Sequence, residues 1–423
     1  MDPAEFQQQY AHFGGFDWAR QEHVVVIVDR LGGIVYDQAL PETAEGWAAF
    51  RQAIAPLQPL AIAVETSNGP AVERLLELEV AVYPMNPKAA GSYRQRKAPS
   101  GVKDDHLDGW SFADALRTDG HGWRKLLPET EATKLLRLLC RDQVALIEQR
   151  TALVNALQQC LLEYYPAALE AFDDWTAPSS WAFLEQFPTP ELLLKRGKRK
   201  WQNFLHTQKL YSPQTAEKRL EIFARADQFV SPSSAVTQAK SFLAQRLAKQ
   251  LRLLEEQLRQ YQEQIEQAFR AHPDHELFDS LPGAGLKTKA RLLGEIGTDP
   301  QRFADGDALR AYAGSAPVTQ QSGQSRRVYL RRACNKPLRQ AMHFLADLSR
   351  HACDWAQAYY QLHRDQGDSH QGALRKLAGR WEKILWKMLQ TRQKYDPGKR
   401  LADMVRHGSP VIPLLREGQA ATA

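Results

Sequence analysis

The first third of the chain alternates short apolar runs with amphipathic segments. The runs at 23–29 (HVVVIVD), 60–66 (LAIAVET) and 80–85 (VAVYPM) predict strands, because they are rich in residues that favour extended backbone. Segments 43–56 and 69–79, which separate the later runs, carry apolar residues at helical spacing. We therefore predict a mixed α/β unit, with Thr43 capping the first of these helices.

Two further runs complete the strand pattern. Residues 32–40 (GGIVYDQAL) follow the run at 23–29 after a turn and predict a hairpin. The segment GGFDWAR, which contains Asp17, precedes both and is predicted to be the first strand. Three strands, a helix, a strand, a helix and a strand follow the order of the ribonuclease H-like fold. In that fold the first and fourth strands are neighbours.

The remaining two thirds of the chain have a helical pattern. Residues 129–165 and 234–272 carry apolar side chains at alternating steps of three and four, the spacing of a coiled-coil seam. Two such helices can pair within one chain or join two protomers. Between them, 166–233 is less regular and contains several prolines. After Asp396 the composition indicates a loosely ordered tail.

These patterns predict an α/β domain followed by all-α parts, in a chain long enough for each to bury a core. The predicted divisions are a ribonuclease H-like domain at 8–128, a helical coiled-coil region with a basic insert at 129–276, a helical domain at 277–395 and a tail at 396–423.

The composition restricts the partners and the cellular compartment that we expect for the protein. The 423 residues carry a formal net charge of +6, which favours a polyanionic partner only weakly. No apolar run is long enough to cross a bilayer, and the N-terminal sequence MDPAEFQQQYAHFGG is too polar for a signal peptide. The four cysteines are scattered, which fits a reducing cytoplasm. We expect a cytoplasmic protein with no membrane partner.

Carboxylates mark the first candidate site, and two of them follow a segment predicted to be a basic loop, KAAGSYRQRKAPS. Asp17 lies in the first predicted strand and Glu65 ends the fourth, while Asp105 and Asp108 are one helical turn apart in GVKDDHLDGW. If the helix packs across the neighbouring strands, these four acids converge on a site for two Mg²⁺ ions that act on a phosphodiester. Asp104 replaces Asp105 if the helical register shifts. Alternatively, the paired aspartates only cap a helix N-terminus.

A serine in a basic segment marks the second candidate site. Ser322 precedes Gly323 in the polar loop predicted for APVTQQSGQSRRVYLRRACNK, and Ser315 and Ser325 are rival nucleophiles. A serine hydroxyl attacks a phosphate only where cations stabilise the transition state. Alternatively, Ser-Gly is a turn in a solvated loop. The candidate cations that follow are Arg326, Arg327, Arg331, Arg332, Lys336 and Arg339.

Two further segments could bind nucleic acid. In LPGAGLKTKARLL, Gly283 and Gly285 would let backbone N–H groups approach a phosphate, with Lys287 and Lys289 adding charge. The alternative is an ordinary turn between helices. The segment KRGKRKW suits a phosphate backbone with Trp201 as a stacking platform, or is simply a solvated cluster. Its basic residues are Lys195, Arg196, Lys198, Arg199 and Lys200.

Together these motifs resemble the insertion-sequence transposases of the IS110 family, over almost the whole chain before the tail. GGFDWA is similar to the family's first aspartate motif, AVETS to its glutamate motif and SGVKDDHLDGWSFADAL to its paired-aspartate motif. The sequences LPGAGLKTKARLLGEIGTDPQRF and LRAYAGSAPVTQQSGQSRR resemble the signature of the serine-bearing C-terminal domain and place the family serine at Ser322. Gly109 stands where the family usually has alanine, a difference expected to have little effect.

The resemblance implies a RuvC-like DEDD domain that binds Mg²⁺ and a DNA recombinase that moves its own element between donor and target. It implies guidance by a bridge RNA that pairs with both DNA duplexes. It also implies dimers that join into tetramers, with carboxylates and serine from different protomers, in the nucleoid of a bacterial cytoplasm. The alternatives are a structure-selective nuclease that uses metal-activated water, and a non-catalytic nucleic-acid-binding scaffold.

Overall fold

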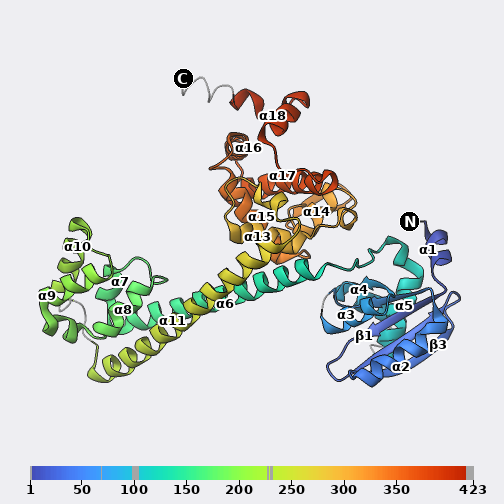
Figure 1. Ribbon diagram of the computed structural model, residues 1–423, viewed down its shortest axis with the longest axis horizontal. Coiled ribbons are helices and arrows are strands. Elements are labelled where there is room, and N and C mark those ends of the chain that lie inside the picture. Colours follow the sequence, from blue (N-terminus) through green and yellow to red (C-terminus); the bar gives the residue numbers. More distant parts are fainter. Residues whose placement is uncertain (1, 68, 98–103, 226–227, 229–231, 416–423) are drawn as a thin grey trace. The chain divides into compact units, whose positions relative to one another are not determined.

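The computed structural model describes residues 2–67, 69–97, 104–225, 228 and 232–415 (Figure 1). The chain divides into two compact units, residues 1–128 and 129–423. The structure is mostly helical, with a five-stranded sheet in the first unit. Over the described residues, no helix is both long and apolar enough to span a bilayer.

The first unit is built on a mixed sheet in the order β3-β2-β1-β4-β5. Strands β1, β2 and β3 pair antiparallel, whereas β1, β4 and β5 pair in parallel. This arrangement is consistent with a ribonuclease H-like domain and confirms that the first and fourth strands are neighbours. The strands span His12–Asp17 (β1), Glu22–Asp29 (β2), Ile34–Pro41 (β3), Leu60–Val64 (β4) and Ala81–Pro84 (β5).

Helices cover both faces of this sheet. Alternate strand residues such as Phe16 and Ile62 pack in one core with α2 (Ala44–Ile54) and α3 (Pro70–Glu77). The intervening residues, which include Ala61, pack in a second core with α1 and α5. As predicted, the Thr43 side chain caps α2. On the opposite face, α1 spans Pro3–Gln9 and buries Phe6, so the core begins before residue 8, while α5 spans Asp105–Asp119.

Helix α5 lies directly on β1 because two glycines meet there. A Cβ placed on Gly15 would lie 1.9 Å from the carbonyl oxygen of Gly109 and 2.7 Å from the amide nitrogen of Ala113. A Cβ placed on Gly109 would lie 3.0 Å from Cγ2 of Val26 in β2. Any side chain at Gly15 would therefore push the α5 backbone off the sheet.

The basic segment before α5 is helical where the structure describes it. Residues Pro87–Lys97 form α4, whereas the sequence pattern indicated a loop. The prediction was wrong because Gly91 and Ser92 obscure the helical pattern, and α4 carries Arg and Lys rather than an apolar stripe. The stretch 98–103 lies outside the described residues.

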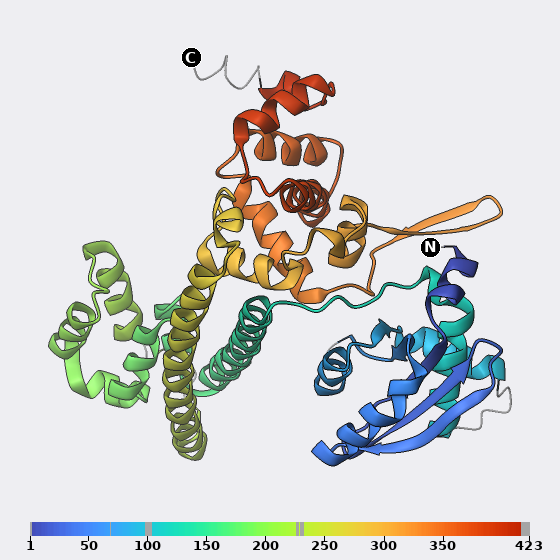
Figure 2. The same ribbon diagram turned by 45° about the vertical axis from the view of Figure 1, so that its right-hand side comes forward.

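In the second unit, α6 (Glu131–Tyr164) and α11 (Ser234–Ala271) run side by side in opposite directions (Figures 1 and 2). Ion pairs join Arg150 to Glu255 at 3.0 Å and Lys240 to Glu163 at 2.6 Å. The two predicted coiled-coil helices therefore pair within one chain. Most of the predicted seam of α11 is buried, but Leu243 is exposed; the buried members are Leu247, Leu251, Leu254, Leu258 and Ile265.

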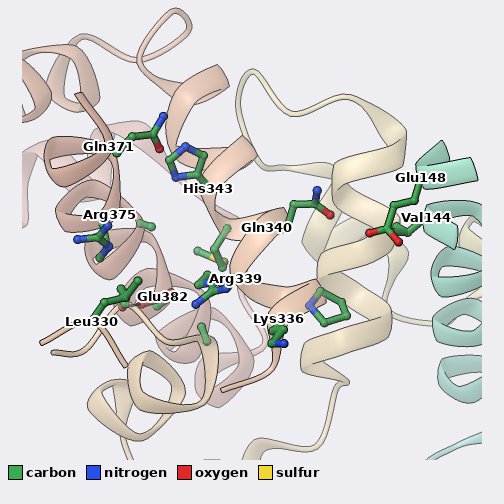
Figure 3. A pocket seen from close by; sticks show the side chains of 15 residues that line it. Val144, Glu148, Leu330, Lys336, Arg339, Gln340, His343, Gln371, Arg375 and Glu382 are labelled. Carbon is green, nitrogen blue, oxygen red and sulfur yellow. Dashed lines mark hydrogen bonds between the residues drawn. The ribbon is translucent and has the colours of Figure 1, made fainter. Parts of the chain in front are cut away.

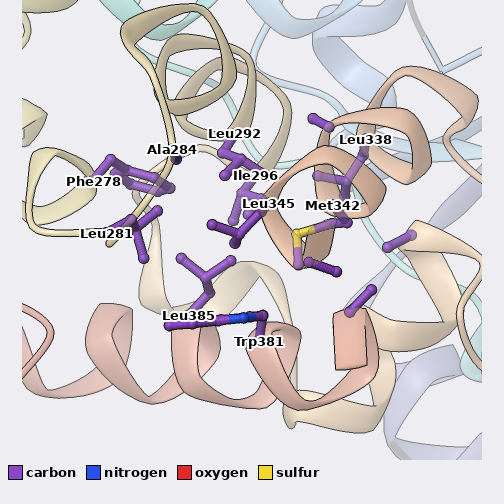
Figure 4. Close-up of a cluster of buried hydrophobic side chains, with 14 of the residues drawn as sticks. Phe278, Leu281, Ala284, Leu292, Ile296, Leu338, Met342, Leu345, Trp381 and Leu385 are labelled. Atoms are coloured by element: carbon purple, nitrogen blue, oxygen red, sulfur yellow. The ribbon is translucent and has the colours of Figure 1, made fainter. Parts of the chain in front are cut away.

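The helical pair carries a hydrophobic core near each end. Towards one end, Leu157 of α6 and Leu251 of α11 join an aromatic-rich core formed by the insert. Towards the other, Leu136 and Phe269 join the C-terminal core, which is centred on leucines, Met342 and Trp381 (Figure 4). The helices of the insert are α7 (Pro166–Ala171), α8 (Pro178–Gln186), α9 (Pro190–Thr207) and α10 (Pro213–Ala224).

Up to residue 415, where the description ends, the C-terminal region is helical apart from turns, loops and one hairpin, β6 (Val318–Ser322) and β7 (Ser325–Tyr329). Its helices are α12 (His275–Asp279), α13 (Leu286–Ile296), α14 (Gly306–Ala313), α15 (Lys336–Ser349), α16 (Asp354–Asp365), α17 (His370–Thr391) and α18 (Pro397–Arg406). Short 3₁₀ turns lie at Ala55–Leu57, Gly120–Gly122 and Pro300–Arg302.

The prediction of a loosely ordered tail after Asp396 is wrong for the part that is described. Asp396 caps α18, and Met404 and Val411 are buried in the C-terminal core. The few apolar residues of this segment were too widely spaced to show that they reach a core. Residues 416–423 lie outside the described chain.

The glycine contact can be tested by Gly15→Ala. We expect this variant to lose about 3 kcal/mol of unfolding free energy, because the added methyl group collides with the α5 backbone. Gly91→Ala is the matched control, since a Cβ there meets nothing within 4 Å and alanine favours a helix. Urea unfolding of both variants measures the difference. Equal unfolding free energies of the two variants would show that this contact does not position α5 on the sheet.

Candidate functional site

The first candidate site begins at two neighbouring strand ends. Asp17 is the last residue of β1, and Glu65 directly follows β4. Because Phe16 pairs with Val64 in the parallel ladder, the next step along both chains brings Asp17 and Glu65 side by side. The alternation of side chains assigns both to the face covered by α5. Asp17 is half-buried, and Glu65 is exposed.

On α5, the predicted carboxylates differ in environment. The Asp108 side chain is only 6% exposed, and both of its oxygens accept from Nη1 of Arg94, at 2.8 and 2.6 Å. Asp105 is exposed in the first turn. Asp104 accepts a hydrogen bond from the amide of His106 at 3.3 Å, so it caps the helix. The capping interpretation therefore holds for Asp104, and the buried acid of the cluster is Asp108.

The acids are not assembled as a set of metal ligands. Within the described residues, no three His, Cys, Asp or Glu side chains are grouped so that they could hold a metal ion. The donor chemistry nevertheless fits a hard divalent cation, because all four predicted ligands are carboxylates. Asp108 is already neutralised by a cation, the guanidinium of Arg94. A metal would therefore compete with Arg94 for this carboxylate.

Arg94 was not identified from the sequence, because the segment of α4 was predicted to be a loop. Arg94 reaches Asp108 from the neighbouring helix, and its side chain is about one-third exposed. On the same helix, Arg96 is more exposed and lies 3.8 Å from Asp114. A buried carboxylate needs a cation or hydrogen-bond donors, so an acid on the sheet-facing side of α5 was the available signal.

The candidate nucleophile, Ser322, is in a hairpin rather than in the predicted loop. Ser322 pairs with Ser325 across the tight turn formed by Gly323, with φ of 55°, and Gln324. The hairpin extends away from the helices of its own unit (Figure 2), and every residue from Thr319 to Leu330 is exposed. The Gly-containing turn was the available hairpin signal, because the flanking strands are mostly polar on both faces and show no alternation. Arg326 and Arg327 lie on β7.

The remaining serine and arginines lie at the base of the hairpin. Ser315, three residues before β6, donates a hydrogen bond to Glu382 of α17. Arg331, just after β7, donates to the Ala316 carbonyl at 3.3 Å, and Arg332 is exposed. The structure therefore separates the three candidate serines into two at the tip, Ser322 and Ser325, and one at the base.

The glycine-rich turn before α13 has a packing role at its first glycine. Gly283 has φ of 70°, and a Cβ there would lie 2.6 Å from the Leu348 carbonyl oxygen. Gly285 caps α13 and faces open space. Lys289 is paired with Asp279 at 2.9 Å, whereas Lys287 is exposed. Gly285 and Lys287 are therefore the members of this motif that a phosphate could approach.

The basic segment of the insert lies on α9, which is kinked at Gly197. Trp201 is 5% exposed and donates its indole N–H to the Leu193 carbonyl, so the prediction of a stacking platform was wrong. The apolar face of α9 buries this ring. The cationic side chains are all exposed and include Lys195, Arg196, Lys198, Arg199 and Lys200.

The class of the protein is a transposase, and its N-terminal α/β domain is of a type that suggests the use of a divalent metal. Residues 14–166 match the model of a family described as "Transposase", and residues 275–361 match one described as "Transposase IS116/IS110/IS902 family". The chain belongs to the IS110 family of insertion-sequence transposases.

Curated relatives support this assignment. The chain is 33% identical, over 93% of its length and 97% of the relative's, to a Streptomyces coelicolor mini-circle protein described as a transposase for IS117. It is 30% identical, over 70% of its length and 73% of the relative's, to the 43.6 kDa protein of insertion element IS110 from the same species. The 42 kDa protein of IS900 from Mycobacterium paratuberculosis is 28% identical over 73% of this chain and 75% of its own.

The Arg94 pair generates a test of the carboxylate site. We expect Arg94→Ala to lower the unfolding free energy by about 2 kcal/mol in EDTA, because it leaves the buried Asp108 carboxylate unpaired. We expect Mg²⁺ to restore more stability to this variant than to the unmodified chain, because the carboxylate is free to bind.

Arg96→Ala is the control, because it removes an exposed cation from the same helix and should cost less than about 1 kcal/mol. Urea unfolding with and without Mg²⁺ measures both effects. If Arg94→Ala and Arg96→Ala respond alike, Asp108 does not form a cation site.

Proposed function

We propose that this transposase cuts and rejoins donor and target DNA through a covalent link to Ser322, assisted by a carboxylate site. In this proposal Asp17, Glu65, Asp105 and Asp108 hold Mg²⁺. Family membership supports action on DNA. The observation that supports the proposed carboxylate site is the pairing of β1 with β4, which brings Asp17 beside Glu65. Both residues are assigned to the face of the sheet that α5 covers, and α5 carries the buried Asp108.

In the proposed step, Ser322 Oγ attacks the phosphorus of a DNA phosphodiester. The Oγ–P bond forms as the bond from phosphorus to one deoxyribose oxygen breaks, the serine proton passes to solvent or a base, and the leaving oxygen is protonated to a hydroxyl. Attack by a new DNA hydroxyl on the phosphoserine reverses these changes and joins strands. Because the link conserves the bond energy, rejoining needs no further energy source.

The carboxylates would act around this step by holding a cation. Bound Mg²⁺ supplies positive charge that stabilises the phosphoryl transition state and the leaving oxygen. Asp17 and Glu65 would provide the outer oxygens and Asp108 the buried one, once it has left Arg94. The displaced guanidinium of Arg94 is then free to contact a DNA phosphate.

The proposed partners are inferred from the family resemblance and from exposed cationic side chains. We propose that a bridge RNA selects both DNA duplexes by base pairing, and that homodimers join into a homotetramer. The exposed cations of α9 and of the hairpin, including Arg326 and Arg327, suit nucleic-acid backbones. An exposed hairpin that extends away from its own helices supports the delivery of Ser322 to another protomer.

Substitution of the serine tests the nucleophile. On a suicide DNA substrate, Ser322→Ala should form no covalent protein–DNA product, since no other oxygen replaces Oγ, while Ser325→Ala retains it. Denaturing gels resolve the product. A covalent product that persists in Ser322→Ala would place the nucleophile elsewhere, and strand cleavage without joining would favour the nuclease that uses metal-activated water.

A further inference from the structure

A cavity of about 480 Å³ lies in the C-terminal region at the base of the hairpin (Figure 3). Its walls come from α6, α14, α15 and α17, together with Ser315 before β6 and Leu330 after β7. The segments that enter and leave the hairpin therefore both line it. Ala313 and Ser315 belong to a family motif, but none of the family motifs includes Arg375 or Glu382, which also line the cavity.

Three cationic side chains line the cavity. Lys336 and Arg339 come from the first turns of α15, and Arg375 comes from α17. Within the described residues, none of the three forms an ion pair or a side-chain hydrogen bond, although neighbouring arginines such as Arg310 do. The acid on the opposite wall is Glu148 of α6. Three like charges around one cavity repel one another and attract an anion.

At the back of the cavity lies a buried carboxyl group. Glu382 is 0% exposed; one of its oxygens accepts from the Ser315 hydroxyl, while Oε1 has no hydrogen-bond partner. Burial raises the pKa of Glu382 to about 8, so this carboxyl is mostly protonated at neutral pH and can donate. Ser315 is fixed by its backbone amide, which donates to the Arg310 carbonyl at 3.1 Å, after Gly314 in the left-handed region.

We propose that this cavity binds a backbone phosphate of a nucleic-acid strand, held by Lys336, Arg339 and Arg375. A backbone phosphate is opposite in charge to the three cations and offers acceptors to a protonated Glu382. A small apolar ligand would leave the cations unpaired, and a metal ion would be repelled by them. A strand held between Ser315 and Leu330 would also fix the base of the hairpin whose tip carries Ser322.

The test compares two substitutions on α17, each of which removes one positive charge. Arg375→Gln removes a cation from the cavity, and Lys387→Gln removes an exposed cation from α17 outside it. Fluorescence polarisation measures the binding of full-length protein to a labelled DNA duplex, a single-stranded DNA and a single-stranded RNA at several salt concentrations. The loss of one phosphate contact should lower the slope of log K against log salt by about 0.9 for the duplex or about 0.7 for a single strand.

We expect this loss with Arg375→Gln and not with Lys387→Gln, on at least one probe. The probe that loses the contact identifies the strand as duplex DNA, single-stranded DNA or RNA. Equal slopes for both variants on every probe would overturn the proposal. Because the readout is binding, it does not depend on Ser322 chemistry, and failure of the strand-joining mechanism would leave it intact.

Glu382 provides a second readout that is specific to the cavity. Between pH 7 and 9 it ionises and adds a negative charge, so binding should weaken several-fold, whereas Glu382→Gln should lose this pH dependence. His343 does not contribute over this range, because burial lowers its pKa from an already lower value. The same pH dependence with and without Glu382 would contradict the proposal. The other charged groups that face Glu382 or the cavity are Arg310, Lys336, Arg339, Arg375 and Glu148.

Discussion

The first unit depends on the contact between Gly15 in β1 and Gly109 in α5. At this point a helix backbone lies directly against a strand, at a separation that leaves no room for a side chain on Gly15. The contact fixes the height of α5 above the sheet. Asp108, one residue before Gly109, is therefore held on the face of the sheet to which side-chain alternation assigns Asp17 and Glu65. The geometry of the candidate site follows from backbone packing rather than from attraction between the acids, which repel one another.

The burial of Asp108 explains the role of Arg94. A carboxylate that is almost fully buried must be neutralised, and Arg94 neutralises Asp108 in the free chain. If Asp108 binds metal as proposed, the guanidinium and a divalent metal would be alternative partners of one carboxylate. Because α4 also carries other basic side chains, a DNA strand that attracts α4 would free Asp108 for the metal. Exchange of Arg94 for Mg²⁺ would then couple DNA binding to the assembly of the site.

The strand order and the neighbouring positions of Asp17 and Glu65 could be predicted from sequence, because short apolar runs and their spacing determine how this sheet pairs. Three other features could not be predicted from the sequence. Helix α4 lacks an apolar stripe, the hairpin of Ser322 is exposed on both faces, and the tail reaches its core through isolated residues such as Met404. Glu382 was also missed, although an acid between Trp381 and Leu385 on the apolar face of α17 was a visible signal. The four-carboxylate metal site and the role of Ser322 remain predictions.

The most direct measurement mixes two inactive protomers. Asp108→Asn removes the buried carboxylate, and Ser322→Ala removes the nucleophile, so neither variant alone should recombine donor and target DNA. If acids and serine from different protomers act on one phosphorus, hetero-assemblies purified with two different tags should recover recombination, because one composite site is intact. Recovery is the predicted result. Hetero-assemblies that form but stay inactive, while tagged unmodified protein is active, would contradict a site shared between protomers.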